Sequence, residues 1–241
     1  MSTYVMSDLH GCYDEYKKML EKIEFKDSDT LYILGDILDR GPNPIKIILD
    51  VMKRPNVEVL VGNHCIMACE CISFLLEEVT EENVDRIQKN PMLIRKLNNW
   101  LQNGAKSTIE EFRKCDKETR KEIMDFIMDF DVYDEIEVNG KTFLLVHAGL
   151  GNFHPDKELW EYELDELVWE RPDYEKKYFD DKYVISGHTP TVFIKNHKRP
   201  GYIYQGNHHI AMDCGCCFQG GRLGCLRLDD MKEFYVEKTE K

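Results

Sequence analysis

Aspartate, asparagine and histidine residues follow apolar stretches at five separate places in this chain of 241 residues. The five segments read SDLHG, GDILDRG, GNHC, HAG and SGHTP, and they contain Asp8, His10, Asp36, Asn63, His147 and His188. Carboxylate, amide and neutral imidazole groups together suit manganese, iron or zinc, whereas calcium takes only oxygen ligands. These residue types therefore predict a metal centre rather than a set of unrelated turns.

The candidate ligands outnumber the needs of one ion, so we predict two metal sites that share one carboxylate. The first site comprises Asp8, His10 and Asp36, and the second comprises Asp36, Asn63, His147 and His188. Asp36 would then bridge two ions about 3.5–4 Å apart, which is the spacing of two-metal hydrolytic sites.

The first third of the chain predicts alternating strands and helices that would carry these residues. Apolar runs predict strands over Thr3–Met6, Thr30–Leu34 and Val57–Val61, and apolar positions at helical spacing predict helices over Tyr13–Ile23 and from Pro44 onward. A β-α-β-α-β order indicates parallel strands. Ligands of such sheets bind beyond the carboxyl ends of the strands, which is where the polar segments fall.

The remainder of the chain predicts a helical insertion followed by further strands, all within one domain over residues 1–241. Residues of about 66–130 have a helical pattern, and they could either cap the site or simply extend the packing. The later strands are expected at Asp134–Val138, Thr142–Val146, Tyr183–Ser186, Ile203–Gln205, Ile210–Met212, Gly224–Leu228 and Glu233–Val236. An Asn-Gly turn at residues 139–140 predicts a hairpin between the first two of these strands.

The composition limits the partners and the location. A net charge of −13 argues against stable nucleic-acid binding, although bound cations would still permit phosphate chemistry. No apolar run reaches 18 residues and no export signal is seen, so we expect a cytoplasmic protein without membrane contact. Reduced thiols are then expected for the nine cysteines, with packing favoured over a zinc site built from them.

The five segments, in this order, resemble the phosphoprotein phosphatase family of binuclear metallophosphoesterases, and more closely its bacterial and phage members. The stretches NNWLQNG (Asn98 to Gly104), VWERPD (Val168 to Asp173) and AMDCGCCFQGGRLGCLRL (Ala211 to Leu228) extend the resemblance over almost the whole chain. It implies an α/β, calcineurin-like metallophosphoesterase fold with two central mixed β-sheets sandwiched by helices. It also implies two divalent metal ions, with manganese expected first and iron or zinc as alternatives.

The resemblance also implies that phosphoesters are hydrolysed by direct in-line attack of a metal-activated hydroxide on phosphorus, and it assigns a role in this reaction to several residues. His64 would be the general acid and Asp39 the residue that pairs with it and favours its charged form. Arg40 and Arg171 would bind the phosphate together with Asn63. Arg171 could instead form a surface salt bridge with Glu170 or Asp173.

Three classes of function are open on the sequence. The first expectation is a protein serine/threonine phosphatase, and the alternative is a symmetrical dinucleoside polyphosphate hydrolase, which resembles this chain closely. A non-catalytic metal- or phosphate-binding regulator is the third. An aromatic clamp for a purine would favour the dinucleotide enzyme, and its candidates are Trp169, Phe193 and Tyr202. The remaining histidines, at 154, 197, 208 and 209, are expected in loops or on the surface.

Overall fold

A computed structural model describes residues 1–76 and 80–239 of the chain. The first part alternates strands and helices as predicted: β1 (Thr3–Met6), α1 (Tyr13–Lys22), β2 (Thr30–Ile33), α2 (Pro44–Val51) and β3 (Val57–Val59). Pro44 occupies the first turn of α2, where its missing N–H costs no hydrogen bond. The three strands are parallel neighbours, so their carboxyl ends lie along one edge of the sheet.

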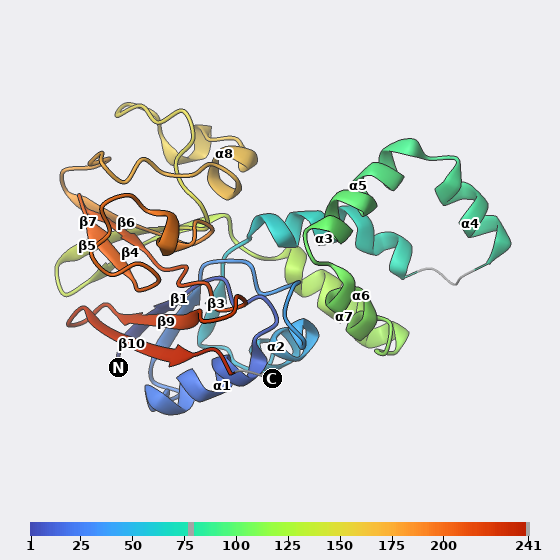
Figure 1. The fold of residues 1–241 in the computed structure, drawn as a ribbon, viewed down its shortest axis with the longest axis horizontal. Coiled ribbons are helices and arrows are strands. Elements are labelled where there is room, and N and C mark those ends of the chain that lie inside the picture. The colour runs from blue at the N-terminus through green and yellow to red at the C-terminus, as the bar shows by residue number, and fades with distance from the viewer. Residues whose placement is uncertain (77–79, 240–241) are drawn as a thin grey trace.

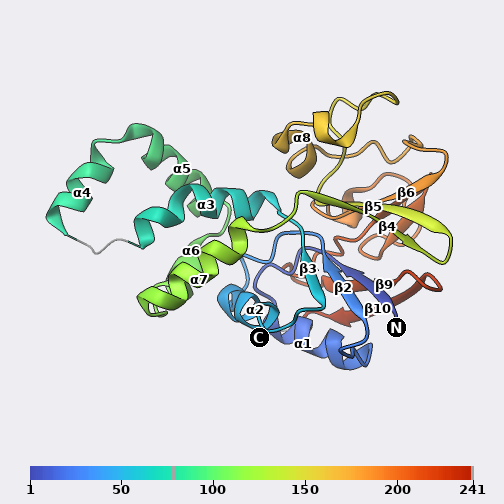
Figure 2. The same cartoon turned by 180° about the vertical axis from the view of Figure 1, so that it is seen from behind.

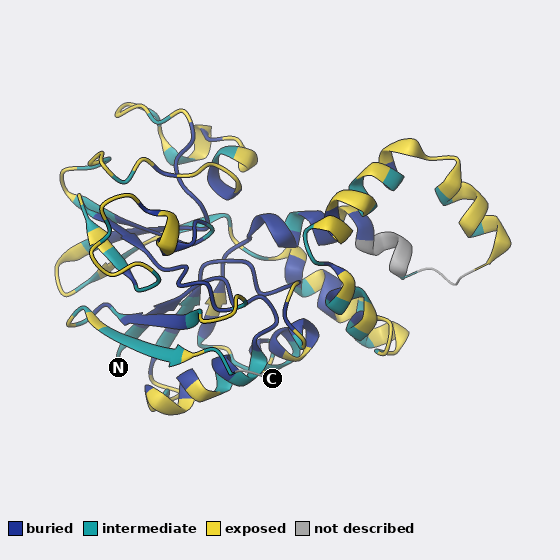
Figure 3. Cartoon of the chain, in the orientation of Figure 1, coloured by how far each residue is buried: buried dark blue, intermediate teal, exposed yellow. Residues whose placement is uncertain are grey.

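Five helices follow β3. They are α3 (Asn63–Leu75), α4 (Glu81–Gln88), α5 (Pro91–Gln102), α6 (Lys106–Phe112) and α7 (Lys117–Met128). Figures 1 and 2 show that α4 projects sideways, away from both sheets, and Figure 3 shows its exposed surface. None of the residues of α4 is buried, whereas Trp100 of α5 and Thr108 of α6 are fully buried. The inner ends of α5 and α6 therefore belong to the core, while α4 lies beyond it.

The rest of the chain adds seven strands and α8 (Leu164–Val168). The strands are β4 (Tyr133–Val138), β5 (Lys141–Val146), β6 (Lys182–Ser186), β7 (Tyr204–Gly206), β8 (His209–Ala211), β9 (Arg222–Arg227) and β10 (Lys232–Glu237). Two short 3₁₀ helices, η1 (Leu159–Glu161) and η2 (Thr191–Phe193), lie in the connections. The predicted hairpin of β4 and β5 is present, with Asn139 in the left-handed backbone region that its turn requires.

Two five-stranded mixed sheets form the centre of the molecule, which confirms the predicted fold class. Their strand orders are β10-β9-β1-β2-β3 and β4-β5-β6-β8-β7. Val5 and Leu226 of the first sheet pack with Leu145 and Ile185 of the second in one apolar cluster, so the sheets face each other. Helices α1 and α2 cover the outer face of the first sheet, and α8 packs against the outer face of the second.

Candidate metal centre

The structure brings the predicted site residues together at the carboxyl ends of the strands. Asp8 and His10 follow β1, Asp36 follows β2, Asn63 and His64 begin α3, His147 follows β5, and His188 follows β6. Parallel strands place their carboxyl ends on one edge, so segments up to 180 residues apart in sequence meet there. All of these side chains are buried except that of His188, which is partly exposed.

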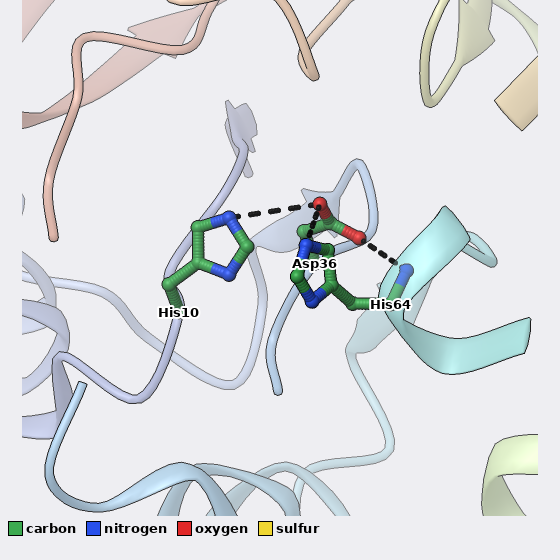
Figure 4. Close-up of side chains that lie close together, drawn as sticks. All are labelled: His10, Asp36 and His64. Atoms are coloured by element: carbon green, nitrogen blue, oxygen red, sulfur yellow. Dashed lines mark hydrogen bonds and ion pairs between the residues drawn. The ribbon is translucent and has the colours of Figure 1, made fainter. Parts of the chain in front are cut away.

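Asp36 lies at the centre of the cluster and faces two groups of donor atoms. Its Oδ2 lies 3.6 Å from His10 Nε2 and 3.9 Å from His64 Nε2. Its Oδ1 lies 3.5 Å from His147 Nε2 and accepts the backbone N–H of His64 at 3.1 Å. In Figure 4, dashed lines join one Asp36 carboxylate oxygen to the His10 and His64 rings and the other to the backbone nitrogen of His64. The two oxygens of one carboxylate thus point toward two separate groups of possible metal ligands.

The two groups able to hold a metal ion are His10, Asp36 and His64, and Asp36, His147 and His188. Asn63 joins the second group, because its Oδ1 lies 3.0 Å from His147 Nε2 and 3.1 Å from His188 Nδ1. The sequence predicts Asp8 in the first group, and this stays a prediction; in the structure the Asp8 carboxylate accepts the backbone N–H of His188 at 3.0 Å. Asp8 therefore lies between the segments that carry the two groups.

Close packing of the backbone holds Asp36 in this position. A Cβ atom at Gly62 would overlap Asp36 Oδ1, and a Cβ at Gly35 would come within 2.5 Å of His147 Nδ1. Gly35 also has a φ of +77°, which other residues adopt only with strain. These two glycines let three strand ends approach closely enough for their side chains to meet.

The protonation of the site suits cations. Burial lowers the pKa of His10 to about 3, and burial together with the neighbouring His147 lowers the pKa of His188 to about 4. The pKa of Asp8 is raised well above its ordinary value by burial and by the carboxylates of Asp213 and Asp36. Buried, neutral imidazoles among crowded carboxylates favour the binding of a cation, which relieves the repulsion between the acids.

Backbone carbonyls fix which nitrogen of each imidazole is free. His10 Nδ1 donates to the carbonyl of Leu38 at 2.9 Å, and His147 Nδ1 donates to the carbonyl of Leu34 at 2.8 Å. The Nε2 atoms therefore carry lone pairs, and His147 Nε2 directs its lone pair at the Asn63 oxygen. Acceptor atoms that face one another without a proton between them fit a shared cation, and carbonyl-bound histidines are usual in metal sites.

The Arg40 guanidinium reaches the same donor atoms. It donates to His10 Nε2 at 2.7 Å and to His64 Nε2 at 2.9 Å. Arg40 must turn away from His10 before this nitrogen can bind a metal. The nearby cavity of about 350 Å³, here called the metal-centre cavity, offers the room, since Arg40, Asn63 and Arg171 line it together with Trp169, Phe193 and Phe218.

His64 and Asp39 form a hydrogen-bonded pair, as the prediction of their partnership requires. His64 Nδ1 lies 2.6 Å from Asp39 Oδ2, and both side chains are fully buried. Two residues that the sequence did not single out complete the arrangement: Trp100 Nε1 donates to Asp39 Oδ2 at 2.8 Å, and Thr108 Oγ1 donates to Asp39 Oδ1 at 2.6 Å. The NNWLQNG stretch, noted only for its resemblance, contains this tryptophan.

Two expectations about aromatic and histidine residues are wrong. Tyr202 does not reach the metal-centre cavity, because its ring packs between Arg222, 3.8 Å from the ring centroid, and Tyr235. His209 is not a surface residue: it lies in β8, is buried, and hydrogen bonds Ser186 Oγ at 2.9 Å. Burial lowers its pKa to about 3, so it packs in the core as a neutral ring.

Arg171 lies on the exposed side of the metal-centre cavity. Asp173, one of its possible salt-bridge partners, pairs with Lys176 at 3.5 Å instead. The positive charge of Arg171 nevertheless acts on the site, because it helps to lower the pKa of His188. Burial, His147 and Asp36 each affect this pKa more strongly.

The cysteines are free thiols, and neither metal-competent group found among the described residues contains one. Burial, assisted by Glu70, raises the pKa of Cys71 to about 11, and burial also raises the pKa of Cys65. Protonated, buried thiols are packing residues.

The comparisons with known proteins agree with this geometry. The family model for calcineurin-like phosphoesterases matches residues 1–223. The chain belongs to this family. The predicted metallophosphoesterase class is thereby confirmed at the level of the family. Within residues 1–76 and 80–239, none of the helices combines the length and the apolar composition needed to span a bilayer.

The curated relatives in this family include enzymes named symmetrical bis(5'-nucleosyl)-tetraphosphatases. The one from Wigglesworthia glossinidia brevipalpis is 28% identical over an aligned length of 287 residues, and the alignment covers 98% of this chain and 99% of the relative. The one from Buchnera aphidicola subsp. Acyrthosiphon pisum (strain 5A) is 34% identical over 116 residues, and that match spans only 47% of this chain and 42% of the relative. The solved metallophosphoesterase from Sphaerobacter thermophilus shares the fold with a TM-score of 0.55 at 16% identity, covering 100% of this chain and 89% of that one.

Proposed function

We propose that this protein hydrolyses dinucleoside tetraphosphates, such as diadenosine tetraphosphate, at a centre of two divalent metal ions. The observation that carries the proposal is the Asp36 carboxylate, whose two oxygens face two donor groups beside a cavity lined by two arginines. The names of the full-length relatives support the choice of a dinucleotide over a phosphoprotein, which was the first expectation from the sequence.

The metal ligands that we propose are Asp8, His10 and Asp36 for the first ion, and Asp36, Asn63, His147 and His188 for the second. His64, which also lies near Asp36, is assigned to proton transfer and not to a metal. Two divalent ions, with manganese tested first, neutralise the phosphate and acidify the attacking water when they are bound. The metals need neutral imidazoles and ionised carboxylates. Burial favours the neutral form of His10 and His188, while burial raises the pKa of Asp36 but the surrounding histidines lower it further, so that the carboxylate is ionised.

The chain's own residues would bind the phosphate and supply a proton. Arg40 leaves the histidine rings for the phosphate oxygens, and Arg171 approaches from the exposed side of the cavity. His64, held by Asp39 through Nδ1, directs Nε2 toward the cavity and protonates the departing oxygen. Trp100 and Thr108 hold the Asp39 carboxylate so that His64 keeps this orientation.

A substrate panel tests the proposal. The protein is loaded with manganese, and kcat/KM is measured for diadenosine tetraphosphate, a phosphoserine peptide and para-nitrophenyl phosphate, with the nucleotide products separated by chromatography. We expect the dinucleotide to be cleaved most efficiently, and to give ADP alone. ATP with AMP would assign asymmetrical cleavage instead. A phosphopeptide cleaved faster than the dinucleotide would restore the protein phosphatase expectation, and no turnover of any substrate would favour a binding protein.

A further inference from the structure

A second cavity adjoins the metal-centre cavity and shares a wall with it. This side cavity, of about 300 Å³, shares Pro190, Phe193 and Phe218 with the metal-centre cavity. A ligand could therefore extend from one cavity into the other past the two phenylalanines. Together the two volumes fall within the range of small-molecule sites, which is about 300–1,000 Å³.

The lining of the side cavity is mostly apolar. Val192 and Cys214 contribute apolar surface, and glycines at positions 201, 215, 220 and 221 leave backbone without side chains along the wall. Arg222 is the charged residue among the described lining, but its charge is already engaged by Glu237 at 3.0 Å and by the carbonyl of Gly201 at 2.8 Å. Such a lining suits a neutral, planar group rather than a phosphate.

Two aromatic rings stand exposed at the boundary between the cavities. Phe193 is 67% exposed and Phe218 is 48% exposed, so neither ring contributes much to the core. The Arg40 guanidinium lies 5.9 Å from the centroid of the Phe218 ring. A group stacked on Phe218 would thus lie close to a phosphate bound by Arg40.

We propose that the side cavity binds one nucleobase of the substrate, stacked on Phe218 and enclosed by Phe193. This inference rests on the proposed function for the identity of the substrate, and it names the residues that select it. Compared with the clamp candidates from the sequence, this subsite keeps Phe193, adds Phe218 and leaves out Tyr202.

A larger cavity of about 620 Å³ on another side of Phe218 is a poorer candidate. It shares only Phe218 with the metal-centre cavity, and its lining includes Asp14 and Glu15. Carboxylates beside a polyphosphate would repel it, even though Glu15 pairs with Lys238, whereas the described lining residues of the side cavity include no carboxylate.

Binding of ADP and of pyrophosphate separates the contribution of the nucleoside from that of the phosphates. Both ligands carry a diphosphate, so the ratio of their dissociation constants, measured by calorimetry on the manganese-loaded protein, reports the nucleoside contact. Stacking of one base corresponds to a ratio of about 5 to 150. We expect Phe218→Ala to remove most of this preference, Phe193→Ala to reduce it, and Phe218→Trp to restore it. Trp160→Ala is the matched control, because Trp160 is 76% exposed and lies outside both linings.

The outcomes distinguish the subsite from the reaction. An unchanged ratio in both phenylalanine variants, or an equal loss in Trp160→Ala, overturns the base subsite. Since ADP binding needs no turnover, a wild-type protein that prefers ADP through Phe218 but leaves diadenosine tetraphosphate intact would sink the proposed function alone. Wild-type protein that binds ADP no better than pyrophosphate overturns the subsite whether or not it cleaves the dinucleotide.

Discussion

On the buried side of the metal centre, next to Asp36, the residues Asp39, His64 and Trp100 are 0% exposed and joined by hydrogen bonds. On the other side, Trp169 and Phe193 are 39% and 67% exposed. We call the first set, with Thr108, the buried wall, and the second set, with Arg171 and Phe218, the exposed rim. Proton transfer requires fixed geometry, and the buried wall supplies it through bonded, packed side chains. The exposed rim can change its side chains at little cost in stability, so it is the natural place for substrate selection.

The backbone shows the same division. Six residues other than glycine in the strand-end segments have a positive φ, namely Asp8, His10, Asp36, Asp39, Arg40 and His188. Left-handed backbone at residues other than glycine costs about 1–3 kcal/mol each and persists only where the surrounding structure enforces it. Trp169 and Arg171, by contrast, are absent from the residues with this strain. The fold thus accepts strain at several of the proposed metal ligands and at Asp39 and Arg40, and accepts none at these two rim residues.

Asp36→Asn tests the centre on which both sides depend, and we expect the largest effect. Loss of the shared charge should lower the metal content from two equivalents to below one, because each donor group loses its carboxylate. Turnover should fall by about 10⁴-fold, since each ion contributes several kcal/mol to the transition state. Elemental analysis of the purified protein measures the metals. Two retained equivalents would contradict the bridging role, and Asp173→Asn, on an exposed ion pair, is the control.

His64→Asn tests whether the buried wall delivers a proton. We expect turnover of an alkyl phosphoester to fall by about 10²-fold or more, as is typical of a lost general acid. The decrease should be smaller for diadenosine tetraphosphate, because a nucleoside diphosphate leaves without needing a proton. Kinetics on both substrates, with metal analysis of the same protein, provide the measurement. Loss of a metal equivalent would assign His64 as a ligand instead, which its distance to Asp36 permits.

The sequence predicted most of the strands along the chain and the set of residues that meet at the strand ends, but not the order of the strands within the two sheets. Parallel strands place their carboxyl ends on one edge by geometry alone, so Asp36, Asn63 and His147 could be grouped from the order of the segments. The hydrogen bond of Asp8 shows the limit of this reasoning. Position along the edge follows from topology, but the Asp8 carboxylate accepts the backbone N–H of His188 because of how the two sheets pack, which no local pattern specifies.

The hydrogen bonds that hold the Asp39 carboxylate could not be predicted from the sequence, for the same reason. Trp100 and Thr108 lie 61 and 69 residues away, in helices whose apolar faces do not reveal which strand end they reach. The prediction for His209 is wrong for a local reason. A strand was expected only from Ile210, but β8 begins one residue earlier, at His209, and lies between β6 and β7.

Trp100→Phe tests the hydrogen bonding of the buried wall while an aromatic ring still fills the position. The substitution keeps a ring but removes the N–H that donates to Asp39, and a hydrogen bond to a charged group contributes about 1.5–3 kcal/mol. We expect the free energy of unfolding to fall by this amount and kcat to fall about tenfold, because Asp39 and His64 lose their fixed orientation. Denaturant titration and steady-state kinetics measure both. Trp160→Phe makes the same chemical change on the surface and should alter neither.

Arg171→Lys tests the exposed rim and has the smallest expected effect. Lysine keeps the charge but loses the planar pair of donors, so KM for the dinucleotide should rise about fivefold while kcat stays within twofold. The free energy of unfolding should stay within about 0.5 kcal/mol, as for surface substitutions in general. Arg199→Lys, at an exposed pair with Glu233, is the matched control. A loss of stability as large as that of Trp100→Phe would mean that Arg171 belongs to the fixed half of the site, and the division between a rigid wall and a variable rim would fail.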